Sequence, residues 1–246
     1  MENLTVQIEP KSAFGTPMKG DTLFGQLCWT VRARHGDRRL QNLLDGYDRN
    51  HPFICVSDAF SSGFLPRPKI PTKFIFSNVT AADRKNLKVK NLLPIEKFDS
   101  HVCDWHRHLV EKSADVQQMD SNRKDRCTRI RTHNSIDRRS NTTGSEGFAP
   151  YSTSEDWYLD GTKWDIHFIF DPERISREEI LGLMHDIGQF GFGRDATNGM
   201  GRFQVNGDAS SIHFPREQKN SDSWLTLAPT APQNPKHTQH LSLIHI

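Results

Sequence analysis

The sequence contains no apolar run that approaches the roughly 20 residues required for a membrane-spanning helix. The first ten residues, MENLTVQIEP, have no basic segment followed by an apolar one, so we expect no secretory signal and a cytoplasmic location. Cysteine is scarce, and its four residues are widely scattered along the chain. Reduced thiols are therefore expected in place of disulfides.

A strong charge of one sign is also lacking. The chain has 32 Lys and Arg residues against 30 Asp and Glu residues, which leaves a net charge of +2. Overall charge therefore does not identify a nucleic-acid partner, and only the local distribution of charge can do so. The length of 246 residues is enough for one large domain or two small ones.

Metal-site and two-metal nuclease patterns are missing as well. No pair of carboxylates stands out for two-metal chemistry. The stretch HVCDWHRH gathers four ligand-type residues, but their spacing matches no usual pairing of zinc ligands. These residues are His101, Cys103, His106 and His108. We expect an exposed polar helix or loop here, with no metal and no cofactor, although zinc is the alternative.

The first part of the chain predicts the order strand, helix, strand. LTVQIEP alternates apolar and polar residues, as a half-buried strand does. DTLFGQLCWTVRARHG has helical spacing of apolar residues, with Asp21 as the expected N-cap and Gly36 as the expected stop. RLQNLLDGY indicates a further short helix, and FICVSDAF indicates a compact apolar strand.

The last part predicts the order strand, helix, glycine-rich loop, strand. DWYLDG and KWDIHFIFD alternate like paired strands, and RFQVNG is the final strand. Between them, SREEILGLMHDIGQFG predicts a helix in which Ser176 and Glu179 form a capping box. Its apolar stripe consists of Ile180, Leu183, Met184 and Ile187.

These two patterns predict an α+β fold with two ferredoxin-like (RRM-like) halves, each containing a βαβ unit. Residues 1–122 form the expected N-terminal half with a polar insertion. Residues 123–240 form the expected C-terminal half with a basic segment and the glycine-rich loop. Residues 241–246, LSLIHI, resemble the translation of a transposase sequencing adapter, so we expect a non-native tail and a longer natural chain.

The glycine-rich loop FGFGRDATNGMGRF is the first candidate site. Glycine permits positive φ and leaves no Cβ between the backbone and a ligand, while arginine supplies fixed positive charge for a phosphodiester. The candidate RNA-binding residues are Gly191, Gly193, Arg194, Gly199, Gly201 and Arg202. The spacing matches neither a Walker A loop nor a dinucleotide fingerprint. A flexible linker is the alternative, but Phe190, Phe192 and Phe203 look buried, which disfavours it.

The second candidate site is the basic run RKDRCTRIRTHNSIDRR at residues 123–139, with seven Arg and Lys residues against two Asp residues. Its polar side chains can bond phosphate, 2′-hydroxyl or base edges. The candidate RNA-binding residues are Arg129, Arg131, His133, Asn134 and Arg138. A solvated basic surface is the alternative.

A third candidate site lies in GTPMKGDTLF, where Lys19 and Thr22 flank the start of the first helix. The amides of a helix N-terminus attract an anion, and Lys19 stands beside them. The alternative is an ordinary capped helix. A rival enzymatic function is RNA cleavage through the 2′-hydroxyl, with His35 or His133 as general acid or base. No local partner identifies such a base.

Four stretches in this order carry a family resemblance: SAFGTPMKGDTLFGQLCW, SDAFSSGFLPRP, RTHNSIDR and GFGRDATNGMGRF. They resemble RAMP-superfamily subunits of type III CRISPR effector complexes. The resemblance is strongest to the type III-A, Csm-type subunit that caps the 5′ tag of the CRISPR RNA, and it runs from about residue 5 to about residue 206.

The resemblance implies a non-catalytic RNA-binding subunit of an antiviral interference complex. Its expected partners are CRISPR RNA, the large polymerase-like signalling subunit and the backbone RAMP subunits. The glycine-rich loop matches the family signature, and RTHNSIDR matches the family's basic segment. Family members continue beyond LTLAPTAPQNP, which adds to the expectation of a truncated chain. Two alternatives stay open: a metal-independent endoribonuclease that processes CRISPR repeat RNA, as some relatives do, and a scaffold that binds only proteins.

Overall fold

The computed structural model describes residues 1–70, 75, 80, 89–111, 126–143, 149–208 and 225–229. The predicted tail at residues 241–246 and the predicted boundary between residues 122 and 123 lie outside these ranges. Among the helices of the described ranges, none combines the length and the apolar character needed to span a membrane.

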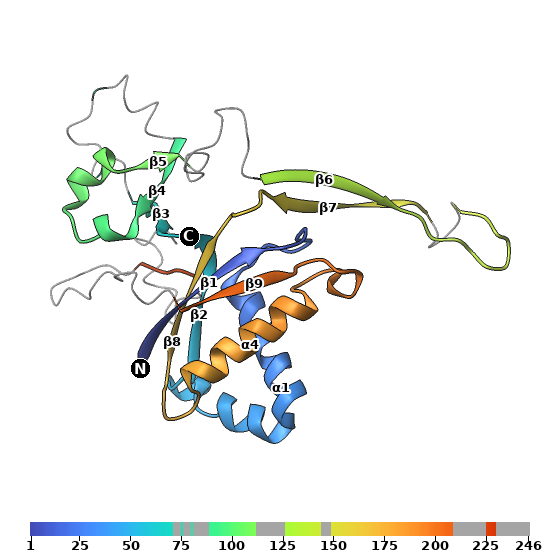
Figure 1. Ribbon diagram of the computed structural model, residues 1–246, viewed down its shortest axis with the longest axis horizontal. Helices are drawn as coiled ribbons and strands as arrows, with labels where there is room; N and C mark the ends of the chain where they lie inside the picture. Colours follow the sequence, from blue (N-terminus) through green and yellow to red (C-terminus); the bar gives the residue numbers. More distant parts are fainter. Residues whose placement is uncertain are drawn as a thin grey trace.

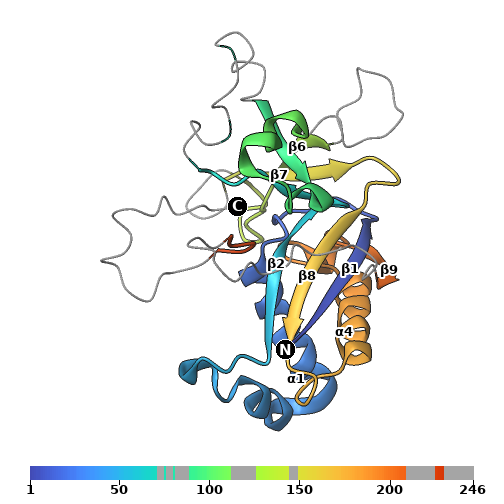
Figure 2. The same cartoon turned by 90° about the vertical axis from the view of Figure 1, so that its left-hand side faces the viewer.

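The body of the protein is a four-stranded antiparallel sheet in the order β2-β8-β1-β9. Its strands are β1 Glu2–Pro10, β2 Ile54–Ser61, β8 Trp164–Phe170 and β9 Phe203–Asp208. Helix α1, Gly20–Leu44, connects β1 to β2, and helix α4, Arg177–Phe190, connects β8 to β9. Both helices cover the same face of the sheet (Figures 1 and 2).

The two predicted βαβ units build this one sheet together. Strand β8 of the second unit lies between β2 and β1 of the first, with Glu2 opposite Phe170 and Ile8 opposite Trp164. The strand order is that of a single ferredoxin-like split βαβ arrangement. The α+β class is therefore confirmed, but two separate ferredoxin-like halves are not, because each unit leaves open strand edges that the other unit fills.

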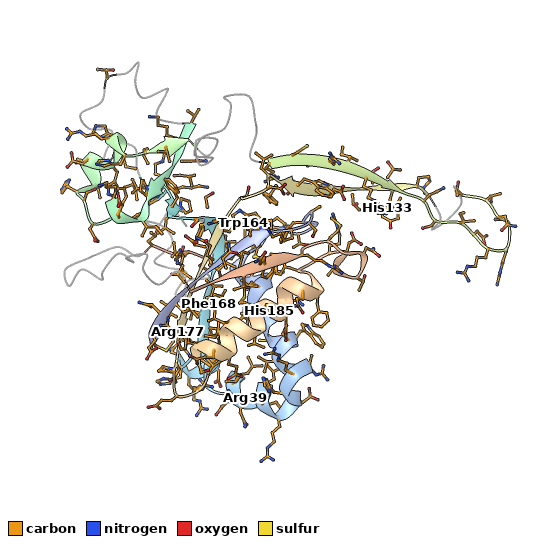
Figure 3. All side chains as sticks on the ribbon, in the orientation of Figure 1. Arg39, His133, Trp164, Phe168, Arg177 and His185 are labelled. Carbon is orange, nitrogen blue, oxygen red and sulfur yellow. The ribbon has the colours of Figure 1, made fainter. Side chains whose placement is uncertain are left out.

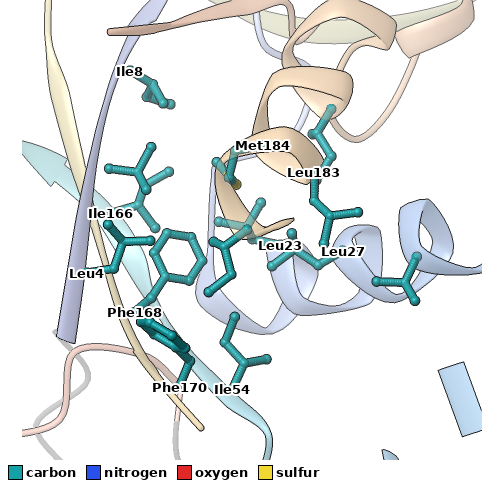
Figure 4. Close-up of a cluster of buried hydrophobic side chains, with 14 of the residues drawn as sticks. Leu4, Ile8, Leu23, Leu27, Ile54, Ile166, Phe168, Phe170, Leu183 and Met184 are labelled. Carbon is teal, nitrogen blue, oxygen red and sulfur yellow. The ribbon is translucent and has the colours of Figure 1, made fainter. Parts of the chain in front are cut away.

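The core lies between this sheet and the two helices (Figure 4). The predicted apolar stripe of α4 faces the sheet, and all four of its residues are at most 1% exposed. Phe168 and Phe170 of β8 and Leu23 and Leu27 of α1 pack in the same cluster. Burial of each such side chain stabilises the fold by about 1.5–3 kcal/mol, which holds the sheet and its helices as one unit.

The helix boundaries follow their capping residues. Ser176 precedes α4, and its hydroxyl accepts a hydrogen bond from the amide of Glu179 at 3.1 Å, as the capping pattern predicts. Gly36 interrupts α1 with φ +81°, so the predicted break is confirmed, and a second helical piece continues to Leu44. The predicted N-cap of α1 is wrong, because Lys19 occupies that position and Asp21 lies in the first turn.

A long insertion separates β2 from β8. It contains a three-stranded sheet formed by β3 Phe64–Pro66, β4 Lys90–Pro94 and β5 Val110–Glu111. It also contains a two-stranded antiparallel ribbon of β6 Arg126–His133 and β7 Tyr151–Tyr158. The strands predicted at DWYLDG and KWDIHFIFD exist, but the expectation that they pair is wrong: β7 pairs with β6, whereas β8 enters the central sheet.

Arg174 caps the end of α1 from a distant part of the chain. Its guanidinium donates to the carbonyl oxygens of Leu43 and Asp45, both at 2.6 Å, and of Asn42 at 3.1 Å. These carbonyls end the helix and have no partner one turn further on. Arg174→Met should lower the free energy of unfolding by about 2 kcal/mol in urea titration, because hydrogen bonds to a charged donor are lost.

The control for this substitution is Arg49→Met, since the ion pairs of the Arg49 guanidinium, with Asp45 and Asp48, are both exposed. Such pairs contribute about 0–1 kcal/mol. A loss for Arg174→Met no larger than that of the control would show that the three carbonyl contacts do not stabilise the end of α1.

Candidate nucleic-acid interface

The ribbon of β6 and β7 projects from the body of the protein and carries most of the predicted basic segment (Figures 1 and 3). Seven of the eight residues of β6 are exposed. Arg129, Arg131 and His133 occupy alternate positions, so their side chains share one face of the ribbon. Arg129 and Arg131 make no ion pair with any residue that the structure describes. We call this surface the cationic ribbon face.

Aromatic rings from both strands lie on the cationic ribbon face. His133 stacks on Tyr151 with ring centroids 5.0 Å apart and an interplanar angle of 11°. The Arg129 guanidinium lies 5.4 Å from the ring centroid of Trp157. Tyr151 and Trp157 stay 54% and 41% exposed. Neither ring was predicted as part of a site, although the alternation of residues in β7 was a signal that could have placed both on the same face of the ribbon as the arginines.

The other face of the ribbon has less free charge. Asp156 accepts a hydrogen bond from the Arg126 guanidinium at 2.9 Å and another from the Thr128 hydroxyl at 2.7 Å. The same residue forms a backbone bridge with Phe14, which fastens the ribbon to the loop after β1. On the cationic ribbon face, the one carboxylate is that of Glu155, which accepts from the Trp157 indole and is buried.

Asn134 and Arg138 follow β6 and are both exposed. The intervening Asp137 does not neutralise Arg138, because its carboxylate accepts from the amide of Arg139 at 2.9 Å and from the hydroxyl of Ser140 at 3.2 Å. This arrangement resembles a turn closed by its own aspartate. The loop therefore extends the positive charge of the cationic ribbon face.

The glycine-rich loop joins α4 to β9, and all four predicted glycines have positive φ. Their amides are mostly used inside the protein. Those of Gly191, Gly199 and Gly201 donate to carbonyl oxygens at 2.8, 2.9 and 2.7 Å. The expectation of bare amides is therefore wrong for these three, because the tight loop bonds to itself and to Ala13. Only the amide of Gly193 has no hydrogen-bond partner among the described residues.

The two arginines of the loop have different surroundings. Arg194 donates from its guanidinium to the carbonyl oxygen of Ser154 in β7, and its Nε lies 3.3 Å from the Asp195 carboxylate. The glycine-rich loop thus contacts the ribbon, which brings the two predicted basic segments together. Arg202 is exposed, and its guanidinium has no partner among the described residues.

Lys19 and Thr22 do not form an open anion site. The Lys19 ammonium lies 2.6 Å from the carboxylate of Asp58, which is 2% exposed and also accepts from the amide of Gly20 at 2.8 Å. Thr22 donates to the side chain of Asp21. The protein's own carboxylate therefore occupies the N-terminus of α1. This role of Asp58 was not predictable from local sequence, because Asp58 lies 38 residues from Gly20 along the chain.

The proposed catalytic bases lie on separate elements. His35 is on α1, with its Nε2 3.8 Å from the Glu179 carboxylate of α4, whereas His133 is on the ribbon. In the described ranges no three His, Cys, Asp or Glu residues are grouped as a metal site. In HVCDWHRH, His101 accepts from the amide of Cys103, and His106 Nδ1 donates to the carbonyl oxygen of Cys103.

Comparison with known proteins identifies the family. The model of the RAMP superfamily matches residues 3–204. No curated protein sequence matches the chain. Chains of similar fold occur in crystal structures of a Csm1-Csm4 cassette in complex with pppApA and with AMPPNP. In both, the TM-score is 0.52 at 16% identity, over 83% of this chain and 69% and 70% of the respective chains. The family match runs from β1 through the glycine-rich loop to the start of β9, and the chain belongs to the RAMP superfamily.

Proposed function

We propose that this chain is a non-catalytic RNA-binding subunit of a type III CRISPR interference complex. It holds the 5′ repeat-derived tag of the CRISPR RNA and bridges the large signalling subunit to the backbone subunits in antiviral defence. Membership of the RAMP superfamily and the fold shared with chains of Csm1-Csm4 cassettes support this role. The observation that carries the proposal is the cationic ribbon face.

Single-stranded RNA offers phosphates and unstacked bases, and this face carries groups for both. Arg129 and Arg131 supply positive charge that no described carboxylate neutralises, which favours phosphate contacts. The exposed rings of Tyr151 and Trp157 supply flat apolar surfaces of the kind on which bases stack. Arg129 and Arg131 lie between Trp157 at one end of this face and Tyr151 at the other, so one RNA strand along the ribbon contacts both kinds of group.

Replacing Arg129 and Arg131 with alanine should weaken the binding of tagged CRISPR RNA about 10- to 100-fold at low salt. Two phosphate contacts are lost, so the slope of log affinity against log salt should become shallower by about 1.4, at about 0.7 per contact for a single strand. Gel shift or fluorescence anisotropy across a salt series measures both quantities.

The matched control is Arg38→Ala with Arg49→Ala, which removes the same charge from exposed positions on the helix side. It should leave affinity and salt slope near the wild-type values. If both double variants lose the same affinity, RNA is attracted by net charge alone and the cationic ribbon face is not the binding site.

The absence of catalysis is part of the proposal and has its own test. His35 and His133 share no contact, and His133 already stacks on Tyr151 and lies 2.9 Å from the Thr153 hydroxyl. Repeat RNA incubated with the chain in EDTA should therefore remain intact. Cleavage that disappears on substitution of either histidine would establish the endoribonuclease alternative instead.

A further inference from the structure

Phe190, the last residue of α4, is exposed although the sequence predicts it to be buried. Its ring is 75% exposed, and among the large apolar side chains of the described residues only Ile130 is more exposed. Phe190 follows Ile187 and Leu183 at helical spacing, yet both of those are 1% exposed. Gly191, with φ +99°, ends the helix and turns the chain away, so Phe190 lies beyond the end of the core.

The backbone next to Phe190 is held firmly. Two residues after it, the amide of Phe192 donates to the carbonyl oxygen of Gly201 at 3.0 Å. This pairing of residues 191–192 with residues 200–201 closes the base of the glycine-rich loop, and we call it the neck. A Cβ on Gly191 would collide with the carbonyl oxygen of Met200, so the two sides of the neck are in close contact. Phe190 therefore projects from a well-fixed position, and ordering its backbone on binding requires little further entropy.

Arg202 directly follows Gly201, on the opposite strand of the same neck. Its amide donates to the Ser12 hydroxyl at 2.8 Å, and its carbonyl oxygen accepts from the amide of Lys11 at 2.8 Å. The backbone of Arg202 is thus fixed on both sides while its guanidinium has no partner among the described residues. An exposed aromatic ring and an unpaired cation flank one rigid neck.

We propose that Phe190 is a base-stacking residue: a nucleobase of the bound RNA stacks on its ring while Arg202 contacts the adjoining phosphate. This inference rests on the proposed RNA-binding function and adds a residue that the basic segments do not contain. The positive charge of Arg202 at the neck favours binding of RNA, which is anionic, over binding of an apolar surface of another protein. The carboxylates of Asp186 in α4 and Asp195 in the loop are already paired with Arg34 and Arg194, so Arg202 leaves a net positive charge on this part of the protein.

Three substitutions separate stacking from simple apolar contact. Phe190→Ala and Phe190→Leu remove the aromatic face, and each should weaken binding of tagged CRISPR RNA about tenfold without changing the salt slope. Phe190→Trp keeps an aromatic face and should bind like wild type. In RNA labelled with 2-aminopurine at successive tag positions, one position should show quenching that Phe190→Leu abolishes.

The matched control is Trp29→Ala, which removes a 64% exposed ring from α1. It should not change affinity. Thermal unfolding of all variants should match wild type, because neither ring is part of the core. If the wild-type chain binds no tagged RNA, the proposed function fails and stacking fails with it. If wild type binds and Phe190→Leu binds with the same affinity, only the stacking role is overturned. The same holds if Trp29→Ala loses as much RNA affinity as Phe190→Ala.

Discussion

Gly201→Ala is expected to lower the free energy of unfolding by about 2–5 kcal/mol. Gly201 has φ +69°, where a residue with a side chain is strained by about 1–2 kcal/mol. An added Cβ would also lie 2.6 Å from the amide nitrogen of Phe192 and still closer to its carbonyl oxygen. Phe192 cannot move aside, because its ring is fully buried, and such overpacking costs about 1–3 kcal/mol.

Gly199→Ala is the matched control, two residues earlier in the same loop. Gly199 has φ +87°, so alanine meets similar backbone strain, but no atom lies within 4 Å of the added Cβ. The loss for this variant should be about 1–2 kcal/mol. Urea unfolding of the two variants isolates the steric contribution of the neck. Equal losses would mean that the neck opens at no cost and that it does not hold Phe190 and Arg202 in place.

The second large expected effect is a loss of stability in acid that depends on His167. This side chain is 6% exposed in β8, and its Nδ1 lies 3.0 Å from the Thr5 hydroxyl. Burial lowers the pKa of His167 from 6.5 to about 4. The unfolded chain therefore binds a proton on this histidine between about pH 6.5 and pH 4, whereas the folded chain does not.

The stabilising contribution of neutral His167 is thus complete above the unfolded pKa and is lost as the pH falls through this window. The loss should be about 2 kcal/mol at about pH 5 and about 3 kcal/mol once the pH is below both pKa values. Asp165 acts in the opposite direction, because burial raises its pKa and the folded chain binds its proton more readily. The wild-type curve alone therefore mixes the two effects.

Urea unfolding of wild type and His167→Gln at about pH 7.5 and about pH 5 separates the contribution of His167 from that of Asp165, since Asp165 is present in both proteins. The stability difference between the two proteins should shrink by about 2 kcal/mol at the lower pH. An NMR titration of the His167 ring in the wild-type protein gives the folded pKa directly. A ring that titrates near its ordinary value would contradict the prediction, whatever the variant does.

The local sequence pattern predicted most helices and strands of the central sheet, because the spacing of apolar residues and helix capping depend on neighbours in the sequence. The stripe of α4, its start after Ser176 and the break of α1 at Gly36 all follow from residues a few positions apart. The same local reasoning was wrong for Phe190. Phe190 was expected to be buried with Phe192 and Phe203, but the end of the helix and the turn at Gly191 place it outside the core.

Local sequence patterns were sufficient to predict the βαβ order of both units, the basic character of residues 123–139 and the glycines of the loop that take positive φ. Contacts between distant segments, in contrast, place both units in one sheet and bring Asp58 against Lys19. They also leave Arg129 and Arg131 without an ion pair to any described residue. This difference arises because periodicity and backbone preference act within a few residues. The partner of a charge or of a strand edge is set by packing between segments far apart in the chain.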